Sequence, residues 1–217
     1  MNLEILTANI VIVGPQGCGK TSIGKGLAQI LQLPFHDGDE MYQGKYKSNI
    51  GKDLVQNPFW GRNRESELIE GLINSTKISK RYGIISPGGG FVRPTTLGLT
   101  TEKVDEFTKK HAQLLEDQTV IYLQPHEDLD EMAEICYRRV QRQQNNNRIS
   151  FGDDKFKSFK NMIHDRHSYY DKVANGIIIG RKDEIEFTPH QMINQTYEWL
   201  KEYDPNLTEE IGERWEE

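Results

Sequence analysis

The segment Gly-Pro-Gln-Gly-Cys-Gly-Lys-Thr at residues 14–21 constrains the fold of this chain more than any other feature. It matches in full the pattern G-x-x-x-x-G-K-[S/T], a loop that cradles nucleotide phosphates. An apolar run, NIVIV, precedes it at residues 9–13, and residues 22–31 follow with Ile23, Leu27 and Leu31 on one helical stripe. This strand–loop–helix context is the one the pattern requires. The sequence therefore predicts a phosphate-binding loop at the start of an α/β fold.

The chemistry of this loop predicts a nucleoside triphosphate ligand, with ATP as the default. Glycines let successive backbone N–H groups point inward at phosphate oxygens, and the following helix N-terminus adds a partial positive charge. Lys20 is expected to reach the β- and γ-phosphates as a catalytic cation, and the Thr21 hydroxyl to bind Mg²⁺. A glycine-rich turn without a ligand is the alternative. The predicted nucleotide-binding residues are Gly14, Gly17, Cys18, Gly19, Lys20, Thr21 and Ser22.

Further apolar runs predict the remaining strands, at residues 83–86, 119–123 and 176–179, with residues 34–36 as a fifth candidate. They are continuous and mostly β-branched, as in strands buried on both faces of a parallel sheet. Amphipathic segments over residues 64–81 and 128–143 lie between them. The alternation predicts a P-loop NTPase-type three-layer α/β sandwich, a parallel five-stranded sheet flanked by helices.

Three polar regions interrupt this pattern within what we expect to be one domain over residues 1–217. Residues 42–58 are predicted to form a loop with short helical pieces. Residues 143–157, in an amide-rich stretch, are predicted to form a mobile lid. Residues 204–217 are acidic and mostly polar, and are predicted to form an exposed tail or a peripheral helix.

Composition narrows the class of protein. Lys and Arg number 27 against 33 Asp and Glu, a net charge of −6, which argues against a general nucleic-acid or anionic-membrane binder. Two cysteines are too few for a disulfide framework, and no apolar run approaches the roughly 20 residues of a membrane span. The start of the chain lacks the features of a signal peptide. We expect a cytoplasmic protein, monomeric or a small homo-oligomer, that binds neither nucleic acid nor membrane.

Two carboxylates, Asp37 and Asp39, follow the predicted second strand. Ligands of open α/β sheets bind at this carboxyl edge. Asp37 is a candidate to hold Mg²⁺, directly or through water, and Asp39 is a candidate to accept a proton or hydrogen bond from a substrate hydroxyl. The alternative is an acidic loop in which Asp39 caps the next helix.

Basic and glycine residues elsewhere predict a second, acidic substrate. Arg62, in the pattern R-x-x-E, stands where we expect the start of a helix, and there a cation is unfavourable unless an anion accompanies it. Gly88, Gly89 and Gly90 follow the third strand and permit close approach of a ligand. Arg166 could supply a second guanidinium to a carboxylate. A surface salt bridge, a flexible turn and a solvated helix face are the respective alternatives.

Together these pieces resemble the shikimate kinases, small P-loop kinases. The order matches over roughly residues 8–180: GPQGCGKTSIGKGLAQIL, FHDGD, RNRESELI, IISPGGG, VIYL and DRHSYYDKVANGIII. The resemblance implies that Asp39 holds substrate hydroxyls and is a candidate base, and that Asp37 helps to place Mg²⁺. It implies that Arg62 and Arg166 bind the substrate carboxylate, in a pocket that Gly88, Gly89 and Gly90 line.

The resemblance also implies a lid arginine that closes over the phosphates. Arg148 is the nearest candidate, although the Pro-Leu that usually follows it in the family is absent, and Arg142 is a candidate for the adenine end. Phe91 is bulkier than the residue that usually follows the three glycines. The predicted activity is ATP- and Mg²⁺-dependent phosphorylation of a small acidic polyol, shikimate above all. A gluconate-type or other small-metabolite kinase is one alternative, and a kinase-derived nucleotide-binding regulatory module is another.

Overall fold

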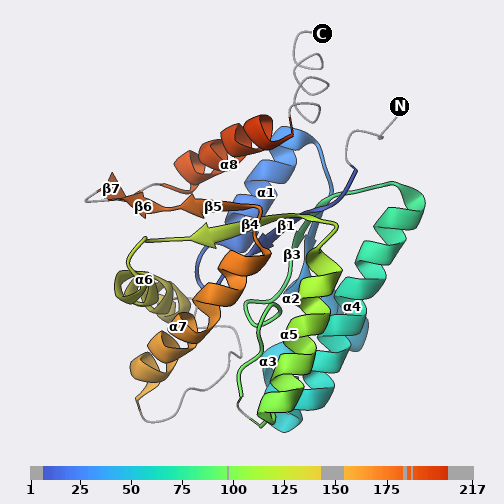
Figure 1. The fold of residues 1–217 in the computed structure, drawn as a ribbon, viewed down its shortest axis with the longest axis vertical. Coiled ribbons are helices and arrows are strands. Elements are labelled where there is room, and N and C mark those ends of the chain that lie inside the picture. Colours follow the sequence, from blue (N-terminus) through green and yellow to red (C-terminus); the bar gives the residue numbers. More distant parts are fainter. Residues whose placement is uncertain (1–6, 97, 143–153, 183–184, 187, 205–217) are drawn as a thin grey trace.

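Five apolar segments pair in one parallel sheet at the centre of the computed structural model (Figure 1). The structure describes residues 7–96, 98–142, 154–182, 185–186 and 188–204. The sheet has the order β2-β3-β1-β4-β5. Its strands are β1 (Ile10–Val13), β2 (Phe35–Asp37), β3 (Ile84–Ser86), β4 (Thr119–Gln124) and β5 (Gly176–Ile179). The predicted parallel five-stranded sheet is therefore confirmed.

Helices connect and cover these strands, as the α/β prediction requires. They are α1 (Lys20–Leu31), α2 (Gly38–Tyr46), α3 (Ile50–Gln56), α4 (Pro58–Ser79), α5 (Thr101–Leu115), α6 (Leu129–Arg142), α7 (Lys155–Val173) and α8 (Pro189–Tyr203). A small antiparallel hairpin, β6 (Arg181–Lys182) and β7 (Ile185–Glu186), follows β5. Among the described residues, no helix is both long and apolar enough to cross a membrane.

Alternating side chains of the strands build a core on each face of the sheet. On β1, Ile10 and Ile12 join a cluster with residues of α1, α6 and α8. Val11 and Val13 point the opposite way and join a cluster with α4 and the end of α5. In Figure 1, α1 and α8 lie across the sheet from α4 and α5. This three-layer arrangement places the carboxyl ends of all five strands along one edge.

The structure corrects several predicted elements. The short helical pieces predicted within residues 42–58 are present, but they take up most of the segment, in α2, α3 and the first residue of α4, so little loop remains. α4 begins at Pro58, six residues before the predicted start at residue 64, because Asn57 accepts a hydrogen bond from the Trp60 N–H and Pro58 fits the first helical position. Helices α5 and α8 and the β6–β7 hairpin were not predicted.

The predicted lid and tail fall mostly outside the described residues. Residues 155–157, which the prediction assigned to the lid, form the first turn of α7. Residues 143–153, which include Arg148, and residues 205–217 lie outside the part of the chain that the structure describes. The mobile lid, the tail and the assignment of a single domain therefore stay predictions.

Candidate functional site

The phosphate-binding loop turns tightly between β1 and α1. Gly14, Gly17 and Gly19 all have positive φ, and at Gly17 an added Cβ would lie 2.5 Å from the carbonyl oxygen of Cys136. Only glycine fits there, because the loop packs directly on α6. Gly19 precedes α1 and brings no side chain to its N-terminus. The first-turn N–H groups and the positive end of the helix are thus directed at the space where an anion would bind.

Lys20 and Thr21 open α1 and point into this space. The Lys20 ammonium donates to the carbonyl oxygens of Gly14 and Pro15, each at 3.0 Å, so it lies over the loop itself. The Thr21 hydroxyl donates to a carboxylate oxygen of Asp37 at 2.7 Å. A hydroxyl and a carboxylate are oxygen ligands of the kind that Mg²⁺ prefers, usually completed by phosphates and water. This pair therefore fits a magnesium ion held between protein and nucleotide.

Asp37, at the end of β2, also organises the next helix. Its carboxylate accepts from the N–H groups of Asp39 and Glu40 at 3.0 and 3.2 Å, which makes Asp37 the N-cap of α2. The alternative in which Asp39 is the cap is wrong. Asp39 instead stands in the first helical turn, exposed, and an added Cβ at Gly88 would lie 3.3 Å from its carboxylate. The cap thus presents Asp39 to the glycine-rich turn.

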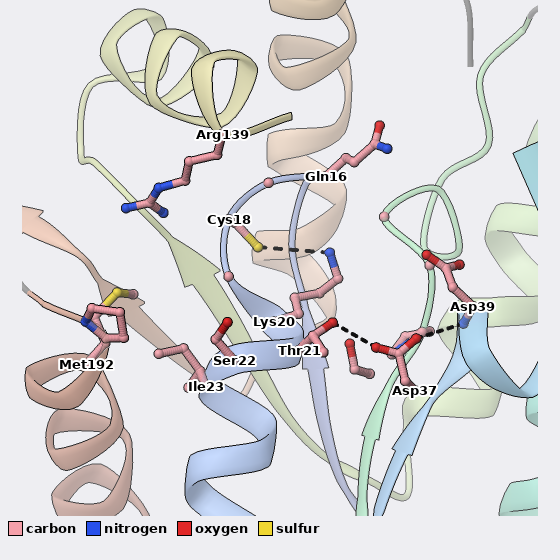
Figure 2. A pocket seen from close by; sticks show the side chains of 17 residues that line it. Gln16, Cys18, Lys20, Thr21, Ser22, Ile23, Asp37, Asp39, Arg139 and Met192 are labelled. Carbon is pink, nitrogen blue, oxygen red and sulfur yellow. Dashed lines mark hydrogen bonds between the residues drawn. The ribbon is translucent and has the colours of Figure 1, made fainter. Parts of the chain in front are cut away.

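A cavity of about 270 Å³ runs along this edge of the sheet. In Figure 2, Arg139 and Met192 lie on one side of Lys20, and Asp37 and Asp39 lie on the other. The lining residues come from the loop, the ends of β2 and β3, α6 and α8: Gln16, Gly17, Cys18, Gly19, Lys20, Thr21, Ser22, Ile23, Asp37, Asp39, Ser86, Pro87, Gly88, Gly89, Arg139, Pro189 and Met192. The cavity therefore runs from Arg139 and Met192, past the phosphate loop, to Asp37 and Asp39.

Next to the end of the cavity that Asp39 and Gly88 line is a buried ionic cluster of Arg62, Glu65 and Arg166. The Arg62 guanidinium donates to the Glu65 carboxylate one turn along α4, and both side chains are about 95% buried. Arg166, on α7, is 2% exposed and donates to the carbonyl oxygen of Gly89 at 3.2 Å. Burial, with a smaller contribution from the nearby charge of Arg62, lowers the pKa of Arg166. Two cations and one anion therefore share a site with little water.

This cluster is short of acceptors. Within the part of the chain that the structure describes, the Nε and Nη2 atoms of Arg166 have no hydrogen-bond partner, and one oxygen of Glu65 has none. Buried polar groups are nearly always paired, because each unpaired one costs about 1–3 kcal/mol or more. The formal charge of the three side chains is +1. An anionic ligand with several acceptor oxygens would satisfy both the charge and the donors.

The glycine-rich turn after β3 joins the cluster to the cavity. The Gly89 carbonyl accepts from both Arg166 and the Tyr170 hydroxyl, one turn apart on α7. At Gly90, an added Cβ would overlap the Arg62 guanidinium and lie 3.0 Å from Nη2 of Arg166. The absence of a side chain at Gly90 is what lets both guanidinium groups approach the turn.

The predicted site residues fall into three groups. The loop residues 17–22, Asp37, Asp39, Gly88 and Gly89 line one cavity, and the predicted Gly14 does not line it. Gly90, Arg62 and Arg166 meet in the buried cluster beside the cavity. Arg142, predicted at the adenine end, is exposed at the last residue of α6 and does not line the cavity. Arg139, one turn earlier, lines it instead. Arg148 lies outside the described residues, so its role stays a prediction.

Sequence reasoning missed Gln16, Arg139, Pro189 and Met192 as cavity residues. The sequence did indicate Gln16, because it lies inside the phosphate-loop motif. A signal also existed for Pro189 and Met192, since the segment after the fifth strand must leave from the same carboxyl edge. Arg139 and Arg142 could not be separated from sequence alone, because which of two basic residues turns inward depends on how α6 packs.

Comparison with known proteins finds similarity to shikimate kinases, both in a family profile and in individual sequences. The profile of the shikimate kinase family, described as "Shikimate kinase", matches residues 16–201. A shikimate kinase of Shewanella denitrificans is 28% identical over 191 residues, which cover 86% of this chain and 95% of that protein. One of Shewanella frigidimarina is 33% identical over 139 residues, 58% of this chain and 78% of that protein.

Solved structures match at the level of the fold. A shikimate kinase from Acinetobacter baumannii in complex with shikimate has a TM-score of 0.69 at 20% identity, and the match covers 91% of this chain and 94% of that one. A gluconokinase from Sinorhizobium meliloti has a TM-score of 0.52 at 13% identity, and covers 94% and 97%. At these identities the likeness concerns architecture, and both kinds of enzyme share it.

Proposed function

Because the chain belongs to the shikimate kinase family, we propose that it transfers the γ-phosphoryl group of ATP to a hydroxyl group of shikimate or a closely similar acidic polyol. The family match supports the kinase class. The choice of acceptor depends on the residues of this chain, because 28% identity over the longest alignment given above leaves room for a change of substrate.

The observation that carries the proposal is the incompletely paired guanidinium of Arg166. Its Nε and Nη2 atoms form the two-pronged edge that matches a carboxylate, and within the described residues neither has a partner. The Arg62 guanidinium also approaches Gly90, and its charge is already balanced by Glu65. A substrate carboxylate at this point would balance the excess positive charge. An uncharged analogue would leave it buried and unpaired, which is a strong basis for selectivity.

The opposite end of the cavity suits a nucleotide. Arg139 from α6 and Met192 from α8 lie on the side of Lys20 away from Asp39 (Figure 2), and Pro189 of α8 lines the same cavity. A guanidinium plane stacks well on an aromatic base, and the two apolar side chains give a surface for its other face. The loop N–H groups and Lys20 then hold the phosphates. This order supports binding of ATP with its γ-phosphate directed toward Asp39.

The proposed reaction balances with the groups present. The acceptor oxygen forms a bond to the γ-phosphorus, the bond from that phosphorus to the β–γ bridging oxygen breaks, and ADP leaves. Asp39 orients the acceptor hydroxyl and takes its proton. Lys20 offsets charge on the transferring group, and Thr21 with Asp37 would hold Mg²⁺, which supplies further charge neutralisation. Burial of the acid limits water as a competing acceptor.

The test is ADP release with Mg·ATP and three acceptors: shikimate, gluconate and the methyl ester of shikimate. We expect saturable turnover with shikimate and at least a 100-fold lower kcat/KM with the ester, because the ester cannot balance Arg166. Turnover with gluconate alone would keep the kinase chemistry and replace the substrate. ATP binding without turnover of any acid would contradict an enzyme and favour a nucleotide-binding regulatory module.

A further inference from the structure

His111 lies on α5 between the glycine-rich turn and α4, and the proposed reaction does not use it. It is fully buried. Its Nδ1 contacts the carbonyl oxygen of Phe91, and its Nε2 contacts the hydroxyl of Ser66. The ring stacks on that of Phe91, with centroids 4.0 Å apart and planes 18° from parallel. One imidazole thus spans two segments that both carry residues of the candidate site.

The partners decide where the ring proton is. The Phe91 carbonyl can only accept, so Nδ1 carries the hydrogen and donates to it. Burial lowers the pKa of His111 to about 3, so the ring is neutral near pH 7. Nε2 of a neutral ring with a protonated Nδ1 is an acceptor, and the Ser66 hydroxyl donates to it. Both hydrogen bonds have fixed directions, and a hydrocarbon side chain of the same shape would make neither.

Each bond ends beside residues of the acid-binding cluster. Phe91 directly follows Gly90, and its N–H donates to the Gly88 carbonyl at 3.0 Å, which closes the turn. Ser66 lies one helical turn after Arg62, and its hydroxyl oxygen is 2.9 Å from the Arg62 carbonyl oxygen. The gap between turn and helix is what accommodates the Arg62 guanidinium against Gly90, where even one methyl group would not fit.

We propose that His111 is a positioning residue for acid binding: its two ring nitrogens fix the spacing between the glycine-rich turn and α4, and so place Arg62 and Arg166 for the substrate carboxylate. The inference rests on the proposed function. It also accounts for Phe91, whose large side chain gives the imidazole a surface to stack on. Neither Ser66 nor Phe91 lines the cavity that contains the phosphate loop, so we expect the effect on acid binding to exceed that on the nucleotide.

The test compares three variants in steady-state kinetics. His111→Phe keeps the stacking on Phe91 and removes both hydrogen bonds. His111→Asn keeps an N–H donor near the position of Nδ1. Ser66→Ala removes only the hydroxyl that Nε2 accepts from. Ser79→Ala is the control, since the Ser79 hydroxyl donates to the carbonyl oxygen of Ser75 at 2.8 Å, at the far end of α4.

We expect His111→Phe to raise KM for shikimate at least 10-fold, and KM for Mg·ATP to stay within twofold of wild type. His111→Asn should recover part of the loss, and Ser66→Ala should raise the shikimate KM about 3- to 10-fold. If His111→Phe does not fold, Ser66→Ala gives the same comparison. A lower melting temperature with an unchanged ratio of the two KM values would overturn the positioning role. A wild-type protein that neither binds nor phosphorylates shikimate would instead overturn the proposed function.

Discussion

Lys20 is the single side chain on which phosphoryl transfer should depend most. Its ammonium donates to two carbonyl oxygens of its own loop, and these bonds are replaceable by water. Lys20→Ala should therefore lower kcat at least 100-fold, because a positioned cation stabilises charge that develops in the transition state. The melting temperature should stay within about 2 °C of wild type.

Lys25→Ala is the matched control for this measurement. Lys25 lies on the same helix, but it is exposed and pairs with Glu40 at 3.2 Å. Exposed pairs of this kind contribute little to stability, so we expect wild-type turnover in the ADP-release assay. A Lys20→Ala enzyme with kcat within tenfold of wild type would contradict the role of Lys20.

His111 should make the stability of the protein depend on pH. Its folded pKa of about 3 lies below the ordinary value of 6.5, chiefly through burial, with smaller contributions from Arg62 and Lys110 and an opposing one from the Phe91 carbonyl. The unfolded chain therefore binds a proton that the folded chain does not, and stability falls as pH drops from about 6.5 toward 3. Between pH 7 and pH 5 this amounts to about 2 kcal/mol.

Urea denaturation of wild type and His111→Asn at both pH values measures this contribution. Other titrating groups are common to the two proteins and cancel in the comparison. Wild type should lose about 2 kcal/mol more than the variant on going from pH 7 to pH 5. Equal losses would show that the imidazole is not held neutral in the folded state.

At the scale of elements, the glycine-rich turn should tolerate no side chain at its third glycine. A methyl group at Gly90 would overlap the Arg62 guanidinium, which is too buried to move out into water. Gly90→Ala should raise KM for the acid at least 10-fold and lower stability by about 1–3 kcal/mol, as expected for overpacking. The KM for Mg·ATP should not change.

Gly71→Ala provides the control, because Gly71 lies in α4 with no atom within 4 Å of an added Cβ. That substitution should raise the unfolding free energy by about 0.5–1 kcal/mol, since alanine favours a helix over glycine. Kinetics and thermal denaturation of both variants make the comparison. An acid KM in Gly90→Ala equal to that of Gly71→Ala would mean that the guanidinium groups do not bind the acid there.

The sheet and its order of elements were predictable because parallel strands buried on both faces need continuous apolar runs. The helices were less predictable from the sequence. α2 and α3 are short and polar, and local capping by Asp37 and Asn49 rather than an apolar stripe starts them. α5 and α8 did carry signals. α8 has a capping box at Thr188 and Gln191, with Pro189 at its first position.

The candidate site divides in the same way. The phosphate loop and Asp37 are local motifs, so sequence alone could select them as candidates. The meeting of Arg62 and Arg166 joins segments far apart in the chain; the residues suggested two guanidinium groups for one acid, and the family resemblance implied the same. Their burial, and the unpaired nitrogens of Arg166 among the described residues, follow from the packing of α4 and α7 on the glycine-rich turn. No spacing in the sequence encodes that packing.

At the scale of the whole molecule, one sheet edge gathers the two proposed binding sites, one for the nucleotide and one for the acid. All five strands are parallel, so their carboxyl ends place the loop, Asp37 and the glycine-rich turn side by side. The proposed nucleotide site includes the exposed residues Thr21 and Ser22, whereas the proposed acid site keeps an unbalanced buried cation. A protein that holds such a cation gives up stability in exchange for binding.

The substitution Arg166→Met tests whether this buried cation lowers stability and is needed for binding of the acid. Methionine has a similar length, leaves the Arg62–Glu65 pair balanced, and leaves the Tyr170 hydroxyl to donate to Gly89. Replacing a buried, incompletely paired charge by an apolar side chain is often neutral or stabilising by 1–4 kcal/mol. We therefore expect the melting temperature without ligands to be unchanged or higher, although the variant has lost a group of the proposed site.

Ligand-induced shifts then separate the two ends of the cavity. Mg·ADP at about 100 times its Kd should stabilise wild type and Arg166→Met alike by about 2.7 kcal/mol, or roughly 5 to 10 °C. Shikimate should raise the melting temperature of wild type and not that of the variant. Lys160→Met is the control on the same helix, since Lys160 pairs with Asp130 at the surface and should leave both shifts intact. A shikimate shift that survives in Arg166→Met would mean that the buried cation serves no acid, and its unpaired nitrogens would then need another ligand.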